Sequence, residues 1–229
     1  MAAAIIAVAF PRVLGYNTTV WKHTTSRCQV PRPPRVSEND LTDALVRVVA
    51  ERGLDAVSVR TVARAAGVSA GAVQYYFRTK DAMLHAAYRR VIDRVTERVT
   101  RLLPAARARD FVRALLLELL PLDEEREAEL RVGLAFTARS VVSAPLAALY
   151  TEGYRTLLEA LEAGLRLAVA QGEAAPGIDP RREAVTAAAL ADGLAWHLLC
   201  APGALSRDEV TSALDAHLDR LFAADATEL

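Results

Sequence analysis

Hydrophobic residues recur at helical spacing along almost the whole chain after residue 36, and no stretch shows the apolar–polar alternation of a half-buried strand. Proline and glycine punctuate this pattern, most clearly at Pro104, Pro121 and the pair Pro202-Gly203. The pattern therefore predicts an all-α protein with about nine helices. The expected helices cover residues 38–52, 59–66, 70–76, 80–103, 108–120, 124–141, 145–172, 180–200 and 206–223.

The most informative stretch is residues 58–80, SVRTVARAAGVSAGAVQYYFRTK. Ser58 and Ser69 each precede a short helical pattern, and serine is a favoured N-cap residue. Gly67 lies between the two patterns, where a left-handed turn costs glycine nothing. These signals predict a helix-turn-helix whose inward positions are Val62, Ala63, Val68, Val73 and Tyr76.

The outward positions of this stretch are polar donors, and no Asp or Glu occurs between Ser58 and Lys80. A solvated helical hairpin usually mixes charges, so this bias favours DNA binding over an ordinary bundle hairpin, which is the alternative interpretation. The donors are Arg60, Ser69, Gln74, Tyr75 and Lys80.

The net charge of zero hides a strong asymmetry along the chain. Residues 1–36 contain five Lys/Arg and no acid, and residues 37–103 contain eleven basic and eight acidic residues. Residues 104–229 contain twelve basic and twenty acidic residues. A basic amino-terminal part followed by an acidic part is typical of a DNA-binding domain fused to another domain.

Residues 1–36 do not continue the helical pattern. An apolar start ends at Pro11-Arg12, and VPRPPR follows further on. We expect a disordered or poorly packed extension. Two alternatives are a basic arm that reaches DNA through Arg32 and Arg35, and a secretion or membrane-surface segment. The rest of the chain is predicted to consist of a DNA-binding domain over 37–84 and a ligand-binding and dimerisation domain over 85–229.

Two charged groups are expected to be solvated. The first is a set of arginines along the fourth helix, which are expected to pair with Asp93 and Glu97 nearby in sequence. Its members are Arg90, Arg94, Arg98 and Arg101. The second is the acidic run from Glu124 to Glu129, which favours a helix start through the helix dipole.

The last two expected helices are rich in Ala and Leu, are apolar on wide faces and are joined by a short loop. This predicts a helical hairpin that packs against a copy of itself to form a homodimer. The alternative is a core hairpin of a monomer.

The chain resembles the TetR family of bacterial transcriptional regulators over about residues 38–223, most specifically in TVARAAGVSAGAVQYYFRTKDAML. The part from ELRVGLAFTARSV to ADGLAWHLL is similar to BetI-like ligand domains. The resemblance implies a repressor that binds operator DNA as a homodimer and is released by a small-molecule effector. The implied DNA-binding residues are Ser58, Arg60, Ser69, Ala70, Gly71, Ala72, Gln74, Tyr75 and Lys80.

Two positions depart from the family pattern. Gln74 stands where tyrosine is usual, and Tyr75 stands where histidine is frequent. Ala70 and Ala72 offer few hydrogen-bonding groups, so base reading would depend on Arg60, Gln74 and methyl contacts to thymine.

The resemblance places the effector inside the carboxy-terminal bundle. Polar or aromatic residues on otherwise apolar helices are the candidate contacts, although each is also a plausible core residue. An aromatic, mostly apolar pocket suits an amphipathic or weakly cationic molecule, and Asp192 is expected to pair with a cation or with Arg139. The candidates are Phe111, Phe136, Arg139, Tyr150, Tyr154, Asp192, Trp196 and His197.

The sequence offers little to an enzyme hypothesis, which is kept as the alternative of a helical binding protein or enzyme without DNA function. The four histidines have no partner at metal-ligand spacing, so no metal or other cofactor is expected. Cys28 and Cys200 form no disulfide framework, which favours a reducing cytoplasm. No apolar run reaches the length of a membrane span.

Overall fold

The computed structural model describes residues 36–102 and 107–222. Within these ranges it is all-α, with nine α-helices, one short 3-10 helix and no β-strand, as predicted. The helices are α3 (Glu38–Arg52), η1 (Leu54–Ala56), α4 (Val59–Ala66), α5 (Ala70–Tyr76), α6 (Lys80–Leu102), α7 (Ala108–Leu117), α8 (Glu124–Ser140), α9 (Ala144–Gln171), α10 (Pro180–Cys200) and α11 (Arg207–Leu221).

The helix starts are set by side-chain caps. The Ser37 hydroxyl accepts from the Asp40 amide at 3.1 Å while the Asp40 carboxylate accepts from the Ser37 amide at 3.0 Å, which completes a capping box. Ser58 and Ser69 cap α4 and α5, as predicted, by accepting from the amides of Thr61 and Ala72 without the reciprocal bond of a capping box. Gly67 ends α4 at φ 67°, in the left-handed region.

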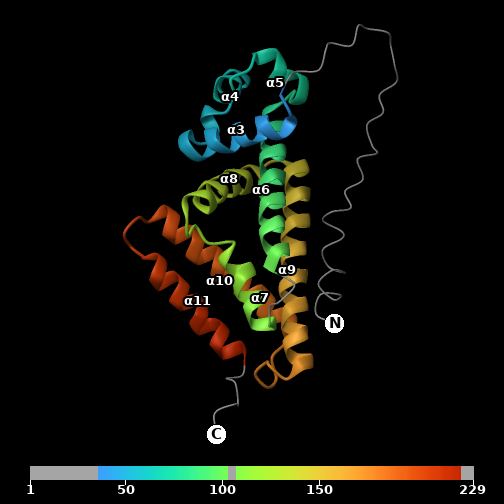
Figure 1. Cartoon of the computed structure of the whole chain (residues 1–229), viewed down its shortest axis with the longest axis vertical. Helices are drawn as coiled ribbons and strands as arrows, with labels where there is room; N and C mark the ends of the chain where they lie inside the picture. Colours follow the sequence, from blue (N-terminus) through green and yellow to red (C-terminus); the bar gives the residue numbers. More distant parts are fainter. Residues whose placement is uncertain (1–35, 103–106, 223–229) are drawn as a thin grey trace, which may run out of the picture.

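Helices α3, α4 and α5 form a small head at one end of the molecule (Figure 1). Its core contains the predicted inward residues Val62, Ala63 and Val73, all buried. The start of α6 continues this core with Met83 and Ala87. The helix-turn-helix is thus held by its own hydrophobic contacts and by the base of the long helix α6.

Helices α7, α9, α10 and α11 form a second layer around a larger core. The close approach of α9 to α7 requires glycine at position 164. A Cβ there would lie 2.7 Å from Val112 Cγ2 and 3.1 Å from Phe111 Cδ1, closer than carbon atoms pack. No helix within the described ranges is both long and apolar enough to cross a membrane.

Helix α8 lies directly below the head and crosses α6 (Figure 1). Val132, in the middle of α8, is fully buried in the same hydrophobic cluster as the head residues. The head therefore rests on two helices of the carboxy-terminal part, α6 and α8.

The arginines of α6 do not form the solvated, locally paired face that the sequence predicted. Arg90 and Arg94 both reach Asp43 of α3, with N–O distances of 2.8 and 2.9 Å. Arg98 pairs with two acids from other helices at 2.6 Å, Glu118 and Glu129. The spacing of charges along α6 favours pairs within that helix. These arginines lie instead where α6 packs against neighbouring helices, and the acids of those helices are their partners.

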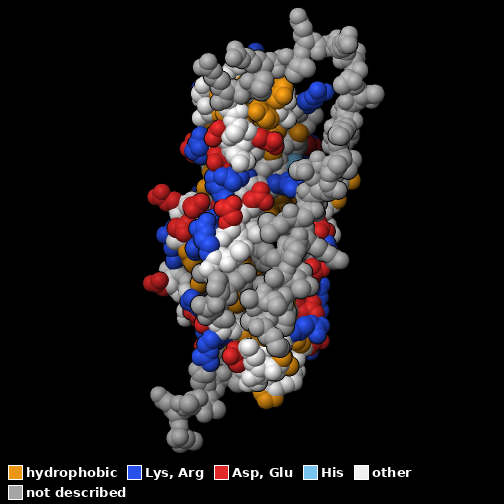
Figure 2. Space-filling model, turned by 45° about the vertical axis from the view of Figure 1, so that its right-hand side comes forward, with side chains coloured by type: hydrophobic (Ala, Val, Ile, Leu, Met, Phe, Trp, Pro, Cys, Tyr) orange, Lys and Arg blue, Asp and Glu red, His pale blue; other side chains and the backbone are white. Residues whose placement is uncertain are grey.

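Within the arginine series, Arg101 does pair locally, with Glu97 at 3.7 Å. The acidic run also divides, because Glu124 and Glu125 are exposed while Glu129 is only 4% exposed. Figure 2 shows basic and acidic side chains next to one another across the middle of the face that it presents.

Some predictions lie outside the described residues. They include the extension before Val36, with Arg32 and Arg35, and the turn at Pro104. Helix α7 ends at Leu117, three residues before its predicted end, because the chain turns at residues 118–120 ahead of Pro121.

Candidate DNA-binding surface and ligand cavity

The predicted DNA-contacting residues gather on the outer side of the head, on α4, α5 and the start of α6. Arg60, Gln74, Tyr75 and Lys80 are all exposed, and Tyr75 keeps half of its surface in solvent despite its size. Ala72 is partly buried, and the remaining candidates are exposed: Ser58, Ser69, Ala70 and Gly71.

The two candidate serines already use their hydroxyl groups within the protein. Ser58 Oγ accepts from the Thr61 amide at 3.1 Å, and Ser69 Oγ accepts from the Ala72 amide at 3.2 Å. Each hydroxyl keeps its hydrogen or a lone pair for a further contact. The serines therefore fix the helix starts that present Arg60 and Gln74.

Lys80 is exposed in the first turn of α6, which Thr79 caps by accepting from the Ala82 amide at 3.0 Å. The neighbouring Asp81 carboxylate accepts from Arg139 Nε at 3.2 Å, and Ser143 Oγ lies 3.5 Å from it. Residues 139 and 143 flank the corner between α8 and α9. The start of α6, next to Lys80, is thus tied to the helix that lies below the head.

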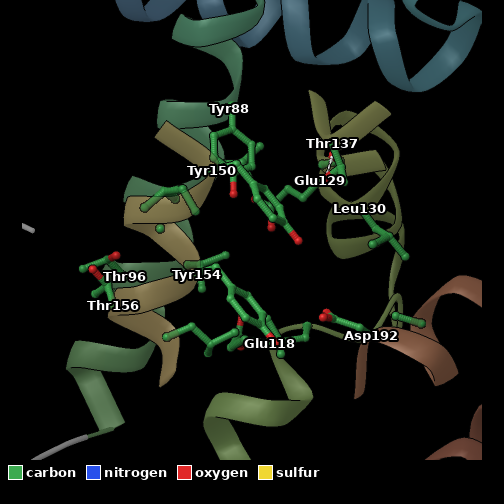
Figure 3. A pocket seen from close by; sticks show the side chains of 18 of the residues that line it. Tyr88, Thr96, Glu118, Glu129, Leu130, Thr137, Tyr150, Tyr154, Thr156 and Asp192 are labelled. Atoms are coloured by element: carbon green, nitrogen blue, oxygen red, sulfur yellow. Dashed lines mark hydrogen bonds between the residues drawn. The ribbon is translucent and has the colours of Figure 1, made fainter. Parts of the chain in front are cut away.

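A cavity of about 390 Å³ opens between α6, α7, α8, α9 and α10. Its size lies within the range of small-molecule sites. Most of the surface of its wall is apolar, and polar groups project into it from several helices (Figure 3). The aliphatic wall comprises Val91, Ile92, Val95, Val99, Leu115, Leu119, Leu130, Leu134, Leu149, Leu157, Ala160 and Ala195.

Three tyrosines face this cavity from α6 and α9 (Figure 3). Tyr150 and Tyr154 lie one turn apart with nearly parallel rings, 6.1 Å between centroids. Tyr88 is only 9% exposed, and within the described ranges its hydroxyl has no hydrogen-bond partner. Desolvation is the main cause that raises the pKa of all three phenols, and the negative charge of Asp192 adds to it, so they stay protonated donors.

Asp192 projects from α10 into the same space (Figure 3). Its side chain reaches solvent through the open cavity, but the surrounding helices desolvate it and raise its pKa. It forms no hydrogen bond or ion pair with any residue that the structure describes. The predicted pairing with Arg139 is wrong, because Arg139 lies outside the cavity and binds Asp81 instead.

The structure brings together four of the eight predicted ligand residues at this cavity: Tyr150, Tyr154, Asp192 and Trp196. Phe111 and Phe136 do not line it, because both are fully buried in the cores behind its wall. Phe136 instead stacks on Tyr88, with 3.8 Å between ring centroids. His197 does not line the cavity and is exposed on α10.

Tyr88 is a cavity residue that the sequence analysis does not identify. It belongs to the apolar stripe of α6, where an aromatic residue is expected in the core. A buried aromatic residue with a polar end needs a hydrogen-bond partner, and this signal applies to Tyr88 as well as to Trp196. The buried Glu118 and Glu129 carry no such signal, because their burial depends on how α7 and α8 pack.

The comparisons with known proteins agree with this geometry. Residues 41–87 match the family described as bacterial regulatory proteins, tetR family, and residues 108–223 match the BetI-type transcriptional repressor carboxy-terminal family. The HTH-type transcriptional regulator PksA of Bacillus subtilis is 31% identical over 198 residues, which cover 82% of this chain and 91% of PksA. This chain belongs to the TetR family of transcriptional regulators.

Other similar proteins are also transcriptional regulators by name. The regulator BetI of Rhizobium meliloti is 31% identical over 69% of this chain and 76% of its own. A transcriptional regulator from a Rhodococcus species superposes with a TM-score of 0.70 at 34% identity, over 80% of this chain and 94% of that one. A Saccharomonospora viridis regulator in complex with choline has a TM-score of 0.76 at 24% identity, over 82% of this chain and 98% of that one.

TetR-family membership confirms that this protein is a helix-turn-helix transcriptional regulator and that it is not an enzyme. No cluster of three or more His, Cys, Asp or Glu side chains suited to a metal ion occurs within residues 36–102 and 107–222.

Proposed function

We propose that this TetR-family protein is a ligand-responsive repressor that binds a palindromic operator as a homodimer in the cytoplasm and is released by a small molecule. The main support is the double role of α8. Its residues Leu130, Gly133 and Leu134 line the cavity, while Val132 packs into the core of the head. A ligand that displaces the inner face of α8 therefore acts directly on the packing of the head.

Dimerisation is proposed through α10 and α11. Val185 and Trp196 of α10 are large apolar residues with 42% and 51% of their surface exposed. Covering such residues on one helix face is a usual reason for a helical hairpin to self-associate. In the dimer, two heads would enter successive major grooves, about 34–36 Å apart.

Release of DNA follows from a change in the spacing of the two heads. The ligand shifts the population toward a state with mismatched spacing, and its effect is limited by its difference in affinity for the two states. Besides the hydrophobic contact at Val132, α8 reaches the head through Glu129. Arg94 lies 3.8 Å from Glu129 and 2.9 Å from Asp43 of α3, so one arginine bridges α8 and the head.

The DNA-binding part is tested by gel retardation with the DNA upstream of the protein's own gene. Lys80→Ala is expected to weaken binding to operator and random DNA alike. It should also lower the slope of log affinity against log salt by about two for a dimer, since each lysine neutralises about one phosphate.

Arg60→Ala is the matched comparison, because it removes one exposed positive charge from the same face. It is expected to relax discrimination at one base pair of each half-site as well as weakening affinity. A loss confined to one base pair in Lys80→Ala, or unchanged binding of both DNAs in Arg60→Ala, contradicts the assigned roles.

The contact between Arg139 and Asp81 yields a second prediction. Arg139→Gln removes the only ion pair of the described residues that joins the end of α8 to the start of α6. We expect faster hydrogen exchange of the amides of residues 82–84, and operator affinity lower by about two- to five-fold, since an exposed ion pair contributes below about 1 kcal/mol.

The control for Arg139→Gln is Arg155→Gln, which removes an ion pair made within α9, with Glu152 and Glu159. It should leave exchange at the start of α6 and operator affinity unchanged. If both variants behave alike, the Arg139 contact does not hold the head.

A further inference from the structure

We propose that the cavity binds a lipophilic organic cation, bulkier than a small quaternary ammonium headgroup, with its positive charge beside Asp192 and its apolar body between α6, α7, α8 and α9. The binding itself stands on the cavity alone. Only its effect on DNA rests on the repressor function proposed above.

The charge of the ligand follows from the balance of charges around the cavity. Five carboxylates line it, and three of them are already neutralised. Arg98 holds Glu118 and Glu129 at 2.6 Å, and Arg155 holds Glu152 at the same distance. The two that form no ion pair within the described ranges are Asp93 and Asp192.

These two aspartates differ in position. Asp93 is exposed on α6 and also borders a second hollow on the other side of that helix. Asp192 projects into the cavity toward the tyrosines (Figure 3). Both carboxylates are exposed, but that of Asp192 points toward the tyrosines, where the helices around the cavity partly shield it from water. A cationic ligand bound there gains an ion pair in surroundings less polar than bulk water.

The two arginines of the cavity wall do not supply this counter-ion. Arg126 is engaged by Glu118 at 3.3 Å, and Arg89 is exposed on α6, where it also borders the second hollow. Neither forms an ion pair with Asp192, although both lie within the cavity lining. An anionic ligand would have to approach Asp192 without a free cation opposite it.

The tyrosines add a second reason for a cation. The rings of Tyr150 and Tyr154 lie nearly parallel on the wall that Asp192 faces, and Tyr88 lines the cavity beyond them (Figure 3). Organic cations bind to aromatic faces through the ring quadrupole. Trp196 of α10 also lines the cavity.

The size of the ligand follows from the aliphatic wall. The cavity extends from Asp192 and the tyrosines along α6 to Val95 and Val99, and across to Leu115 and Leu130. A headgroup alone would leave this apolar surface in contact with water. A cation with a large hydrocarbon body covers it and gains the corresponding hydrophobic free energy.

The experiment uses two probe ions of the same shape and opposite charge, tetraphenylphosphonium and tetraphenylborate, with choline as a small cation. Binding to the purified full-length protein without DNA is measured by isothermal titration calorimetry. We expect tetraphenylphosphonium to bind at least about tenfold more tightly than either of the others. Equal affinity for the two tetraphenyl ions overturns the cation site, and equal affinity for choline overturns the size argument.

Two variants make the result specific. Asp192→Asn keeps the shape of the side chain and is expected to lower tetraphenylphosphonium affinity at least about tenfold, with thermal stability retained. Asp93→Asn makes the same charge change at the exposed edge and should alter affinity less than about twofold. If Asp192→Asn binds like the wild type, or both variants lose affinity equally, the assignment to Asp192 fails.

A separate measurement distinguishes this inference from the repressor function. Tetraphenylphosphonium is added to the protein–operator complex. Asp192-dependent binding without release of DNA supports the cation site and contradicts release by a ligand in this cavity. Release that persists equally in Asp192→Asn supports ligand response and contradicts the cation site.

Discussion

Replacing Arg98 by methionine is expected to destabilise the protein by about 3 kcal/mol, because it strips two buried carboxylates of their main cation. Glu118 and Glu129 have side-chain exposures of only 7% and 4% and lie 2.6 Å from Arg98. Desolvation disfavours the charged guanidinium. The hydrogen bonds with Glu129 and Glu118 outweigh it, so the pKa of Arg98 is raised above its ordinary value.

The loss in Arg98→Met is limited by the remaining cations, since Arg126 lies 3.3 Å from Glu118 and Arg94 lies 3.8 Å from Glu129. The measurement is urea unfolding at one fixed protein concentration, because dimerisation would make stability depend on concentration. Part of the loss should be recovered when Glu118→Gln and Glu129→Gln are combined with Arg98→Met, since the buried charges are then absent.

Arg101→Met is the control, one turn further along α6. Arg101 is 72% exposed and pairs with Glu97, which is 61% exposed. Such a pair contributes little, so we expect a change within about 0.5 kcal/mol. Equal effects of the two substitutions would show that burial of Glu118 and Glu129 does not govern stability here.

Replacing Phe136 by alanine is expected to cost about 3–5 kcal/mol and to weaken ligand binding in the cavity without removing a ligand contact. Phe136 is fully buried and stacks on Tyr88 at 3.8 Å. Its removal leaves a void behind the ring of Tyr88, which can then turn away from the cavity.

Phe111→Ala separates the two effects of the Phe136 substitution. Phe111 is equally buried, but it packs between α7 and α9 and does not line the cavity. Both variants should lose similar stability, measured by urea unfolding, while only Phe136→Ala should bind tetraphenylphosphonium several-fold more weakly. Retained ligand affinity in Phe136→Ala would show that Tyr88 needs no support from behind.

Signals within short stretches of the sequence were sufficient to predict the helical elements and the head. Residues 58–80 fold locally, since Ser58, Gly67 and Ser69 fix helix ends through contacts within a few residues. Hydrophobic periodicity gave the longer helices for the same reason, because a stripe of apolar residues at helical spacing specifies an element without reference to its neighbours.

The side chains that meet across helices could not be predicted in this way, because they depend on how the helices pack. Arg139, Phe136 and Asp192 are all polar or aromatic residues on apolar helices, and periodicity does not distinguish them. Packing sends Arg139 to Asp81, places Phe136 behind Tyr88 and leaves Asp192 facing an open cavity. Burial of charge likewise depends on partners far along the chain, such as Arg98 with Glu129, and the cost of burying a charge is set by those partners.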